Sequence, residues 1–334
     1  MGEWLAEWID ELAASGDVST GTVVNYRWCV KLLSDRLGVR QLVELTDRDV
    51  RSALEYFGAE HVVHNGTKGL SRSTLTRLRS VPTQALDLAV KRRLCVVNVA
   101  KTLRIPKKAK ATRARRSLSL DESRRVVAWL REQTEETFPF RAAVAIQVGI
   151  GCRPGEVLGL RWSDVDLQNG AVSISGALVR EPRPDGVGVL VRRGGTKTPQ
   201  SVRAVKLPSW ALEILIGQRI AWDAAAADRE ILASAGLWEE RDYVFPSARS
   251  HGDLYEPGTY RRGVANMASE LCLGPLVPHE LRHSHASLLL DQGATLEVVA
   301  DRLGHSNTRV TEQAYKHKLQ EVVVAGTDTA ELLG

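Results

Sequence analysis

Four of the eight histidines lie in one stretch of the chain, from Pro278 to Tyr315. The side chains of this stretch that can do chemistry are His279, Arg282, His283, His285, His305 and Tyr315. Histidine exchanges protons near neutral pH, and arginine binds anions through a planar fork of N–H groups. A tyrosine hydroxyl becomes a nucleophile when positive charge and a proton acceptor lie beside it. We therefore interpret the stretch as part of a catalytic site rather than of a hydrophobic core.

The local sequence predicts how helices position these side chains. Pro278 suits a first helical turn and no helix-breaking residue follows until Gly293, which predicts a helix over 279–291. The spacing i, i+3 and i+4 places His279, Arg282 and His283 on one face of this helix.

Two further helices are expected after this one. Thr295 can cap the second, which ends at Gly304, so that His305 lies in a tight turn. A polar residue after His305 can cap the third, which carries Tyr315.

The letters H-E-L-R-H from His279 to His283 also match the zinc-hydrolase signature H-E-x-x-H. In that alternative Glu280 is the general base, and Glu297 or Asp301 is the third metal ligand. Arg282 on the same helical face would repel a dication, and a helix N-terminus favours anions. We therefore rank zinc hydrolysis far below phosphate chemistry.

Upstream residues supply more positive charge. Arg153 lies in GCRPGEV, on a turn directly before a predicted helix, where an arginine can reach a bound anion. Lys197 lies in GGTKTPQ, which we place at the tip of a hairpin between two predicted strands, VGVLVRR and SVRAVKLP. Another strand, with Val172 and Ile174 on one face, follows a turn signal at Asn169-Gly170. The second half of the chain is thus predicted to be mainly helical with a small antiparallel sheet.

Together these groups have the chemistry of a phosphoryl-transfer site. Every candidate except the tyrosine is a cation or can become one by taking up a proton: Arg153, Lys197, His279, Arg282 and His305. Such donors stabilise the negative charge that spreads over a phosphate transition state. No pair of metal-binding carboxylates accompanies them, so we expect arginines rather than a metal to neutralise the charge.

Composition bounds the class of protein. With 334 residues, 43% hydrophobic and 25% charged, the chain is long enough for two globular domains. The four cysteines form no C-x-x-C pair, which argues against a zinc ribbon. We find no apolar run of membrane-spanning length and no basic start typical of a signal peptide, and therefore expect a cytoplasmic protein.

The charge is distributed unevenly and predicts a nucleic-acid partner. Residues 1–116 contain 21 Lys and Arg against 12 Asp and Glu, a net charge of +9, whereas residues 117–334 carry −4. The excess in the first part is typical of a protein that binds a polyanion. The alternative is a basic surface that only aids solubility.

Helical periodicity covers the N-terminal part. We predict a helical DNA-binding domain over 1–103, a basic linker over 104–116 and a second domain over 117–334. In the helical stretch 71–93, Pro82 should cause a kink or a break. The residues expected to contact DNA phosphates are Arg72, Arg77, Arg79, Lys107, Lys108, Lys110, Arg113, Arg115 and Arg116.

The order of the motifs resembles that of one known family. RPGEVLGLRW around Arg153, TKTPQSVRAVKLP around Lys197, HELRHSHASLLL around Arg282, LGH at His305 and Tyr315 ten residues later look like the tyrosine recombinase (phage integrase) family. The resemblance implies a helical core-binding domain followed by a catalytic domain.

The resemblance also implies roles for single residues. Tyr315 would attack the scissile phosphate and form a 3′-phosphotyrosine link, which conserves bond energy, so no cofactor is needed. Arg153 and Arg282 would clamp the phosphate and His305 would add a hydrogen bond. Lys197 would protonate the leaving oxygen, with His279 assisting proton transfer. Glu156 would hold the arginine side chains in place. His283 would either contact the residues that bind the phosphate, without binding it itself, or serve only in packing.

The expected substrate is double-stranded DNA that carries recombination sites, bound by a homotetramer with possible accessory directionality or DNA-bending proteins. The role as integrase of a mobile element is preferred over resolution of chromosome dimers, and a DNA-binding protein without catalysis is less favoured still. The apolar tail after Tyr315 could pack on its own domain or on a neighbouring protomer.

Overall fold

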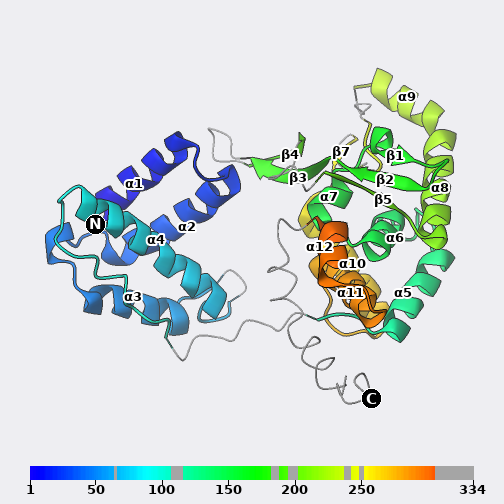
Figure 1. The fold of residues 1–334 in the computed structure, drawn as a ribbon. Coiled ribbons are helices and arrows are strands. Elements are labelled where there is room, and N and C mark those ends of the chain that lie inside the picture. Colours follow the sequence, from blue (N-terminus) through cyan, green and yellow to red (C-terminus); the bar gives the residue numbers. More distant parts are fainter. Residues whose placement is uncertain are drawn as a thin grey trace, which may run out of the picture. The chain divides into compact units, whose positions relative to one another are not determined.

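The computed structural model describes residues 1–63, 66–106, 116–181, 188–194, 202–236, 242–247 and 252–304. These residues form a mainly helical protein with small antiparallel sheets, which confirms the predicted fold class (Figure 1). The contacts divide the chain into two units, Met1–Ala114 with Glu181–Val189 and Arg115–Arg180 with Leu190–Gly334. The division between residues 114 and 115 falls inside the stretch assigned to the linker.

The first unit is helical. Its α-helices are α1 Gly2–Ser15, α2 Thr20–Leu37, α3 Asp47–Ala59 and α4 Arg72–Lys91. Thr46 caps α3, because its hydroxyl accepts from the backbone N–H of Asp49 while the Asp49 carboxylate accepts from the backbone N–H of Thr46. Apolar side chains from all four helices form one core, with Leu5, Leu33, Leu54 and Leu75 fully buried.

Pro82 does not break α4, which runs unbroken through it. Pro82 is itself buried, on the same face as Leu78 and Ala85, so the packing of this face offsets the hydrogen bond that proline cannot donate. The hydroxyl of Thr83 bonds to the carbonyl oxygen of Arg79 at 2.8 Å in the same turn. The predicted break into two helices is therefore wrong, and the alternative, a kink at Pro82, stays a prediction.

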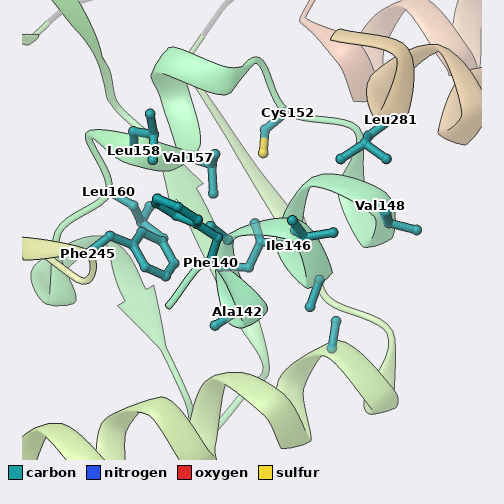
Figure 2. Close-up of a cluster of buried hydrophobic side chains, with 14 of the residues drawn as sticks. Phe140, Ala142, Ile146, Val148, Cys152, Val157, Leu158, Leu160, Phe245 and Leu281 are labelled. Atoms are coloured by element: carbon teal, nitrogen blue, oxygen red, sulfur yellow. The ribbon is translucent and has the colours of Figure 1, made fainter. Parts of the chain in front are cut away.

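The second unit surrounds a buried helix. Its α-helices are α5 Leu120–Glu132, α6 Arg141–Ile150, α7 Pro154–Leu158, α8 Ser209–Ala224, α9 Ala226–Ser234, α10 Pro257–Glu270, α11 Pro278–Asp291 and α12 Leu296–Leu303. Helix α6 is almost entirely buried and packs against α8 and α11. Figure 2 shows Phe140, Ile146, Phe245 and Leu281 among the side chains of this core.

The strands within the described residues form three small sheets. They are β1 Val165–Asp166, β2 Ala171–Ile174 and β5 Arg203–Lys206 in one sheet, β3 Gly176–Glu181 with β4 Val189–Gly194, and β6 Pro246–Ser247 with β7 Asp253–Leu254. The predicted turn at Asn169-Gly170 joins β1 to β2, and Gly170 has a φ of 65°. Positive φ suits glycine, which has no Cβ to clash.

The predicted hairpin around Lys197 is wrong in its pairing. Strand β5 pairs antiparallel with β2, with Arg203 opposite Ile174, whereas β4 pairs with β3. The two strands on either side of Lys197 thus belong to different sheets, because each finds its partner in a different half of 171–181. The alternation of apolar residues identified the strands but carried no information about their partners.

The helices predicted around the histidine cluster are confirmed up to Gly304. Helix α11 begins at Pro278, the hydroxyl of Thr295 accepts from the backbone N–H of Val298 to cap α12, and Gly304 ends α12 with a φ of 65°. The predicted third helix with Tyr315 lies outside the described residues. Among the helices that are described, none is long and apolar enough to span a bilayer.

Candidate active site

The described part of the predicted site consists of Arg153, Glu156, His279, Arg282 and His283. Lys197, His305 and Tyr315 lie outside the described residues. Arg153 and Arg282 come from segments more than a hundred residues apart, and the structure brings both to the buried carboxylate of Glu156. The described side chains thus form a cluster of positive charge around one acidic group.

A tight turn presents Arg153. Gly151 ends α6 in the left-handed conformation, with a φ of 68°, and Pro154 begins α7. The Glu156 carboxylate accepts from the backbone N–H of Arg153 at 2.8 Å and from its Nη1 at 2.6 Å. The Glu156 side chain is 2% exposed, whereas that of Arg153 is 38% exposed. Arg153 is therefore held from inside while part of its side chain faces solvent.

Arg282 projects from α11 toward the same turn. Its Nη1 donates to the carbonyl oxygen of Gly151 and its Nη2 to that of Leu303, both at 2.8 Å. Burial, followed by the charge of Arg153, lowers the pKa of Arg282 to about 10, so the guanidinium stays charged at neutral pH. These two bonds use two of the five N–H groups of a guanidinium.

Three arginines bind the end of α12. Arg203 Nε donates to the carbonyl oxygen of Arg302 at 2.8 Å, Arg282 Nη2 to that of Leu303 at 2.8 Å, and Arg153 Nη2 to that of Gly304 at 3.2 Å. The last carbonyl groups of a helix lack partners within the helix and carry partial negative charge, which cations stabilise. The backbone is therefore fixed up to Gly304, the residue before His305 in the sequence.

Arg203 was missed in the sequence analysis. Its Nη2 donates to Glu156 Oε2 at 3.0 Å, and its side chain is 8% exposed. Burial alone would raise the pKa of Glu156, but the charge and hydrogen bond of Arg203, together with the bonds and charge of Arg153, hold it below the ordinary value. Arg203 and the buried Val205 are two apart on β5, so a basic residue on the apolar face of a strand was the signal that could have found it.

A chain of buried hydrogen bonds holds the turn that carries Arg153. Tyr260 Oη donates to Gln147 Oε1 at 2.7 Å, and Gln147 Nε2 donates to the carbonyl oxygen of Cys152 at 3.1 Å. Burial, with a further contribution from Glu156, raises the pKa of Cys152 to about 12, which keeps this thiol protonated. Cys152 is thus a packing residue.

The histidines of α11 differ in their surroundings. His279 is exposed and lies edge to face with the half-buried His283, with 6.3 Å between the ring centres. His285 is buried, and its Nδ1 lies 3.0 Å from the carbonyl oxygen of Val148. Burial lowers the pKa of His285 to about 4, so this ring is neutral.

Glu280 does not have the surroundings of a catalytic base. Its side chain is buried, and its carboxylate accepts from the backbone N–H groups of Val277 and Arg116, each at 3.0 Å. A base in a zinc hydrolase must face its metal-bound water, but this carboxylate joins the start of α11 to the preceding chain. Within the described residues, no group of three potential ligands is placed to hold a metal ion.

Four of the nine predicted DNA-contact residues lie in the described part of the chain. Arg72 and Arg77 are exposed on α4, whereas Arg79 Nη1 donates to the carbonyl oxygen of Leu103 at 2.6 Å. The Arg116 guanidinium donates to the Leu273 carbonyl oxygen and to Glu122. Arg79 and Arg116 thus have structural partners, and their DNA contacts stay a prediction. The others lie outside the described residues: Lys107, Lys108, Lys110, Arg113 and Arg115.

The cluster has the composition of an oxyanion site that works by arginine donors. Three guanidinium groups surround one ionised carboxylate, so positive charge exceeds negative charge where Arg153 reaches solvent. Such a cluster can bind an oxyanion such as a phosphate.

The chain belongs to the phage integrase family, whose model matches residues 116–321. It is therefore a tyrosine recombinase, an enzyme that cleaves and rejoins DNA. This confirms the family resemblance and the activity expected from the motifs.

Relatives and solved structures agree with this assignment. The chain is 29% identical over 297 residues to an integrase of Streptomyces ambofaciens, covering 87% of the chain and 69% of the relative. It is 29% identical over 290 residues to the tyrosine recombinase XerC of Xylella fastidiosa strain 9a5c, covering 84% and 80%. The Tn1549 transposon integrase, solved with a circular intermediate DNA, has the same fold, with a TM-score of 0.72, 16% identity and coverage of 96% and 98%.

Proposed function

We propose that this enzyme recombines two double-stranded DNA sites through a 3′-phosphotyrosine intermediate, and that it integrates and excises a mobile element. The observation that supports the proposal best is the meeting of Arg153 and Arg282 at Glu156 and at the last carbonyl groups of α12. The last of these carbonyl groups belongs to Gly304. His305 follows Gly304 directly in the sequence, and Tyr315 comes ten residues after His305.

In the proposed reaction, Arg153 and Arg282 bind the two non-bridging oxygens of the scissile phosphate. A guanidinium keeps its charge at neutral pH and can donate two parallel hydrogen bonds, so two of them suit a phosphate with developing charge. Glu156 carries no proton in the reaction. It holds Arg153 through a backbone bond and a side-chain bond, which fixes the direction of the guanidinium.

The other catalytic roles fall to His279 and to three residues outside the described part, Lys197, His305 and Tyr315. The Tyr315 oxygen attacks the phosphorus, the bond to the 5′ oxygen breaks, and Lys197 gives that oxygen a proton. His279 assists the proton transfers, and His305 donates to the phosphate. The released 5′-hydroxyl of one DNA then attacks the phosphotyrosine of the other, which restores a phosphodiester and frees Tyr315. Because one ester replaces another, the cycle requires neither a nucleotide cofactor nor a metal.

The proposed assembly is a homotetramer that holds two DNA sites, with the linker around 104–116 along the phosphate backbone. Seven of the thirteen linker residues are basic and none is acidic, which suits contact with phosphates. Accessory directionality or DNA-bending proteins belong to the same proposal. The enzyme would act in the cytoplasm, where its DNA lies.

Resolution of chromosome dimers is the second candidate, and the similarity to XerC favours it. The similarity to an integrase extends over a comparable part of the chain. Both roles use the same chemistry, so only the DNA sites on which the enzyme acts distinguish them. An integrase would act on the junctions of its own element. A resolvase would act on a chromosomal site outside any element.

A nicked duplex tests the proposal. It would carry the attachment sequence read from the short repeats that flank the element, so that the cleaved fragment diffuses away and the covalent adduct accumulates. We expect an adduct with wild type in the presence of a chelator and none with Tyr315→Phe. Peptide cleavage that a chelator abolishes, without any DNA adduct, would contradict the proposal.

A further inference from the structure

Arg203 is a buried basic residue of the site to which the proposed reaction gives no task. It lies at the start of β5, and its side chain is 8% exposed. A buried guanidinium is costly to desolvate and persists only where its partners compensate. Its partners include the Glu156 carboxylate at 3.0 Å and the Arg302 carbonyl oxygen at 2.8 Å.

Arg203 shares one carboxylate oxygen with the turn that presents Arg153. Glu156 Oε2 accepts from Arg203 Nη2 at 3.0 Å and from the backbone N–H of Arg153 at 2.8 Å, while Arg282 Nη1 lies 4.0 Å away. Without Arg203, this buried oxygen would lose a charged donor. Arg282 Nη1, which lies 4.0 Å from this oxygen, would then be attracted toward it and away from its bond to Gly151.

Arg203 also packs directly on Gly304. A Cβ on Gly304 would lie 2.7 Å from Arg203 Nη1, closer than such atoms approach one another, and 3.2 Å from its Cζ, which is tighter than most contacts. The absence of a side chain at Gly304 therefore lets the guanidinium reach the end of α12. Arg203 thus contacts both parts that fix the direction of Arg153, namely Glu156 and the last turn of α12.

We propose that Arg203 is a positioning residue for the phosphate clamp: it holds Glu156 and the end of α12 so that Arg153 and Arg282 point at one phosphate. It does not touch the phosphate itself. The inference rests on the proposed function, because it assumes that these two arginines bind the scissile phosphate. Small displacements of such groups are expensive, since about 1 Å of misplacement can cost roughly 100-fold in rate.

The test uses the full-length protein and the nicked duplex described above. The variants are Arg203→Ala and Arg203→Lys, and the matched control is Arg192→Ala. Arg192 is equally buried, with 8% of its side chain exposed, and lies in the same unit. It donates hydrogen bonds to Gly159, Asp164 and Ser175, which are not part of the clamp. Affinity for an intact duplex and the single-turnover rate of adduct formation are measured separately.

We expect Arg203→Ala to bind the duplex within about threefold of wild type but to form the adduct about 100-fold more slowly. Arg203→Lys restores the charge but not both bonds of the fork, so it should recover about tenfold of that loss. Arg192→Ala should stay within about threefold of wild type in rate. A merely structural role would lower the affinity for the duplex together with the rate of adduct formation. A lower rate at unchanged affinity therefore supports the positioning role.

A double-mutant cycle with Glu156→Gln tests whether Arg203 acts through Glu156. If it does, the double variant loses little more rate than the worse single variant, because both changes break the same contact. Losses that multiply would overturn the inference. If Arg203→Ala fails to fold, the same cycle is run with Arg203→Lys, which keeps a positive charge beside Glu156.

The results also separate the inference from the proposed function. If wild type forms no adduct, the proposed function fails and the inference with it. If wild type forms the adduct and both Arg203 variants match Arg192→Ala in rate, only the positioning role is overturned.

Discussion

Arg282 Nη1 donates a hydrogen bond of 2.8 Å to the carbonyl oxygen of Gly151, two residues before Arg153. One guanidinium of the proposed clamp thus supports the backbone that carries the other. The second fork nitrogen of Arg282 binds the Leu303 carbonyl oxygen in the same way. The two arginines and the end of α12 are therefore linked by hydrogen bonds. We expect a substitution in one of these parts to displace the others.

Gly151→Ala should damage this unit without touching a charged residue. A Cβ at Gly151 would lie 2.6 Å from the His285 ring and 2.8 Å from Leu303 Cδ2, at a φ of 68°. We expect a decrease in adduct formation of roughly 100-fold, because the carbonyl group that Arg282 binds must move.

Gly293→Ala is the matched control for this variant. Gly293 also has a positive φ, of 84°, but a Cβ there meets nothing within 4 Å. It should lose only about 1 kcal/mol of stability through backbone strain and keep its rate. Equal rates for the two alanine variants would disprove the proposed link between the turn and catalysis.

Arg282→Lys should be nearly as harmful as removal of the side chain. An ammonium group is a single point of charge and cannot bind the carbonyl oxygens of Gly151 and Leu303 together with a phosphate. We expect a loss of roughly 100- to 1000-fold, or about 3 kcal/mol of transition-state stabilisation, in single-turnover cleavage. Arg219→Lys, on the surface of α8 and paired with Asp223, should behave as wild type. An active Arg282→Lys would show that the planar fork is unnecessary.

His285 should make the protein less stable in mild acid. Its folded pKa of about 4 lies below the unfolded value near 6.5, so between these values the unfolded chain binds a proton that the folded chain does not. The stabilising contribution is complete above pH 6.5 and is lost as the pH falls toward 4, by at most about 3 kcal/mol. His285→Asn can keep a donor to Val148 but cannot titrate. Urea unfolding at several pH values should show that the free energy of unfolding depends less on pH in this variant than in wild type. An equal dependence on pH in the two proteins would contradict the low pKa of His285.

The cysteines should differ in their reaction with maleimide. Cys272 is exposed and Cys95 half-buried, whereas Cys29 and Cys152 are fully buried, with pKa values that burial raises to about 11 and about 12. The thiolate is the reactive form, so Cys272 should be labelled first and the two buried thiols only after unfolding. Mass spectrometry of labelled peptides would measure the order. Early labelling of Cys152 would show that the turn beside Arg153 opens in the folded protein.

Much of the fold follows from local signals in the sequence. Thr46, Thr295 and Gly304 have the chemistry of helix ends, and the structure places helix ends at each of them. Pro82 shows the limit of such signals, because the burial of one face of α4 outweighs a lost hydrogen bond. The partners of β4 and β5 depend on contacts between distant segments, which alternation of apolar residues does not encode.

Only part of the site could be predicted, because some of its contacts join residues that are far apart in the sequence. Arg153, Arg282 and Glu156 lie in recognisable motifs, but the function of Arg203 depends on a carboxylate 47 residues away in the sequence and on the end of α12. Likewise, Glu280 matches a zinc motif by its neighbours in sequence, and only its bonds to Val277 and Arg116 show that it serves the backbone.

A methylphosphonate at the scissile position tests the phosphate clamp most directly, because it replaces one charged oxygen by a neutral methyl group. Single-turnover cleavage would be compared for wild type and Arg153→Ala on both substrates. If Arg153 neutralises the phosphate, the defect of the variant should fall from roughly 100-fold on the phosphate to less than about tenfold on the methylphosphonate. The same defect on both substrates would show that Arg153 does not bind the scissile phosphate and would contradict the central claim.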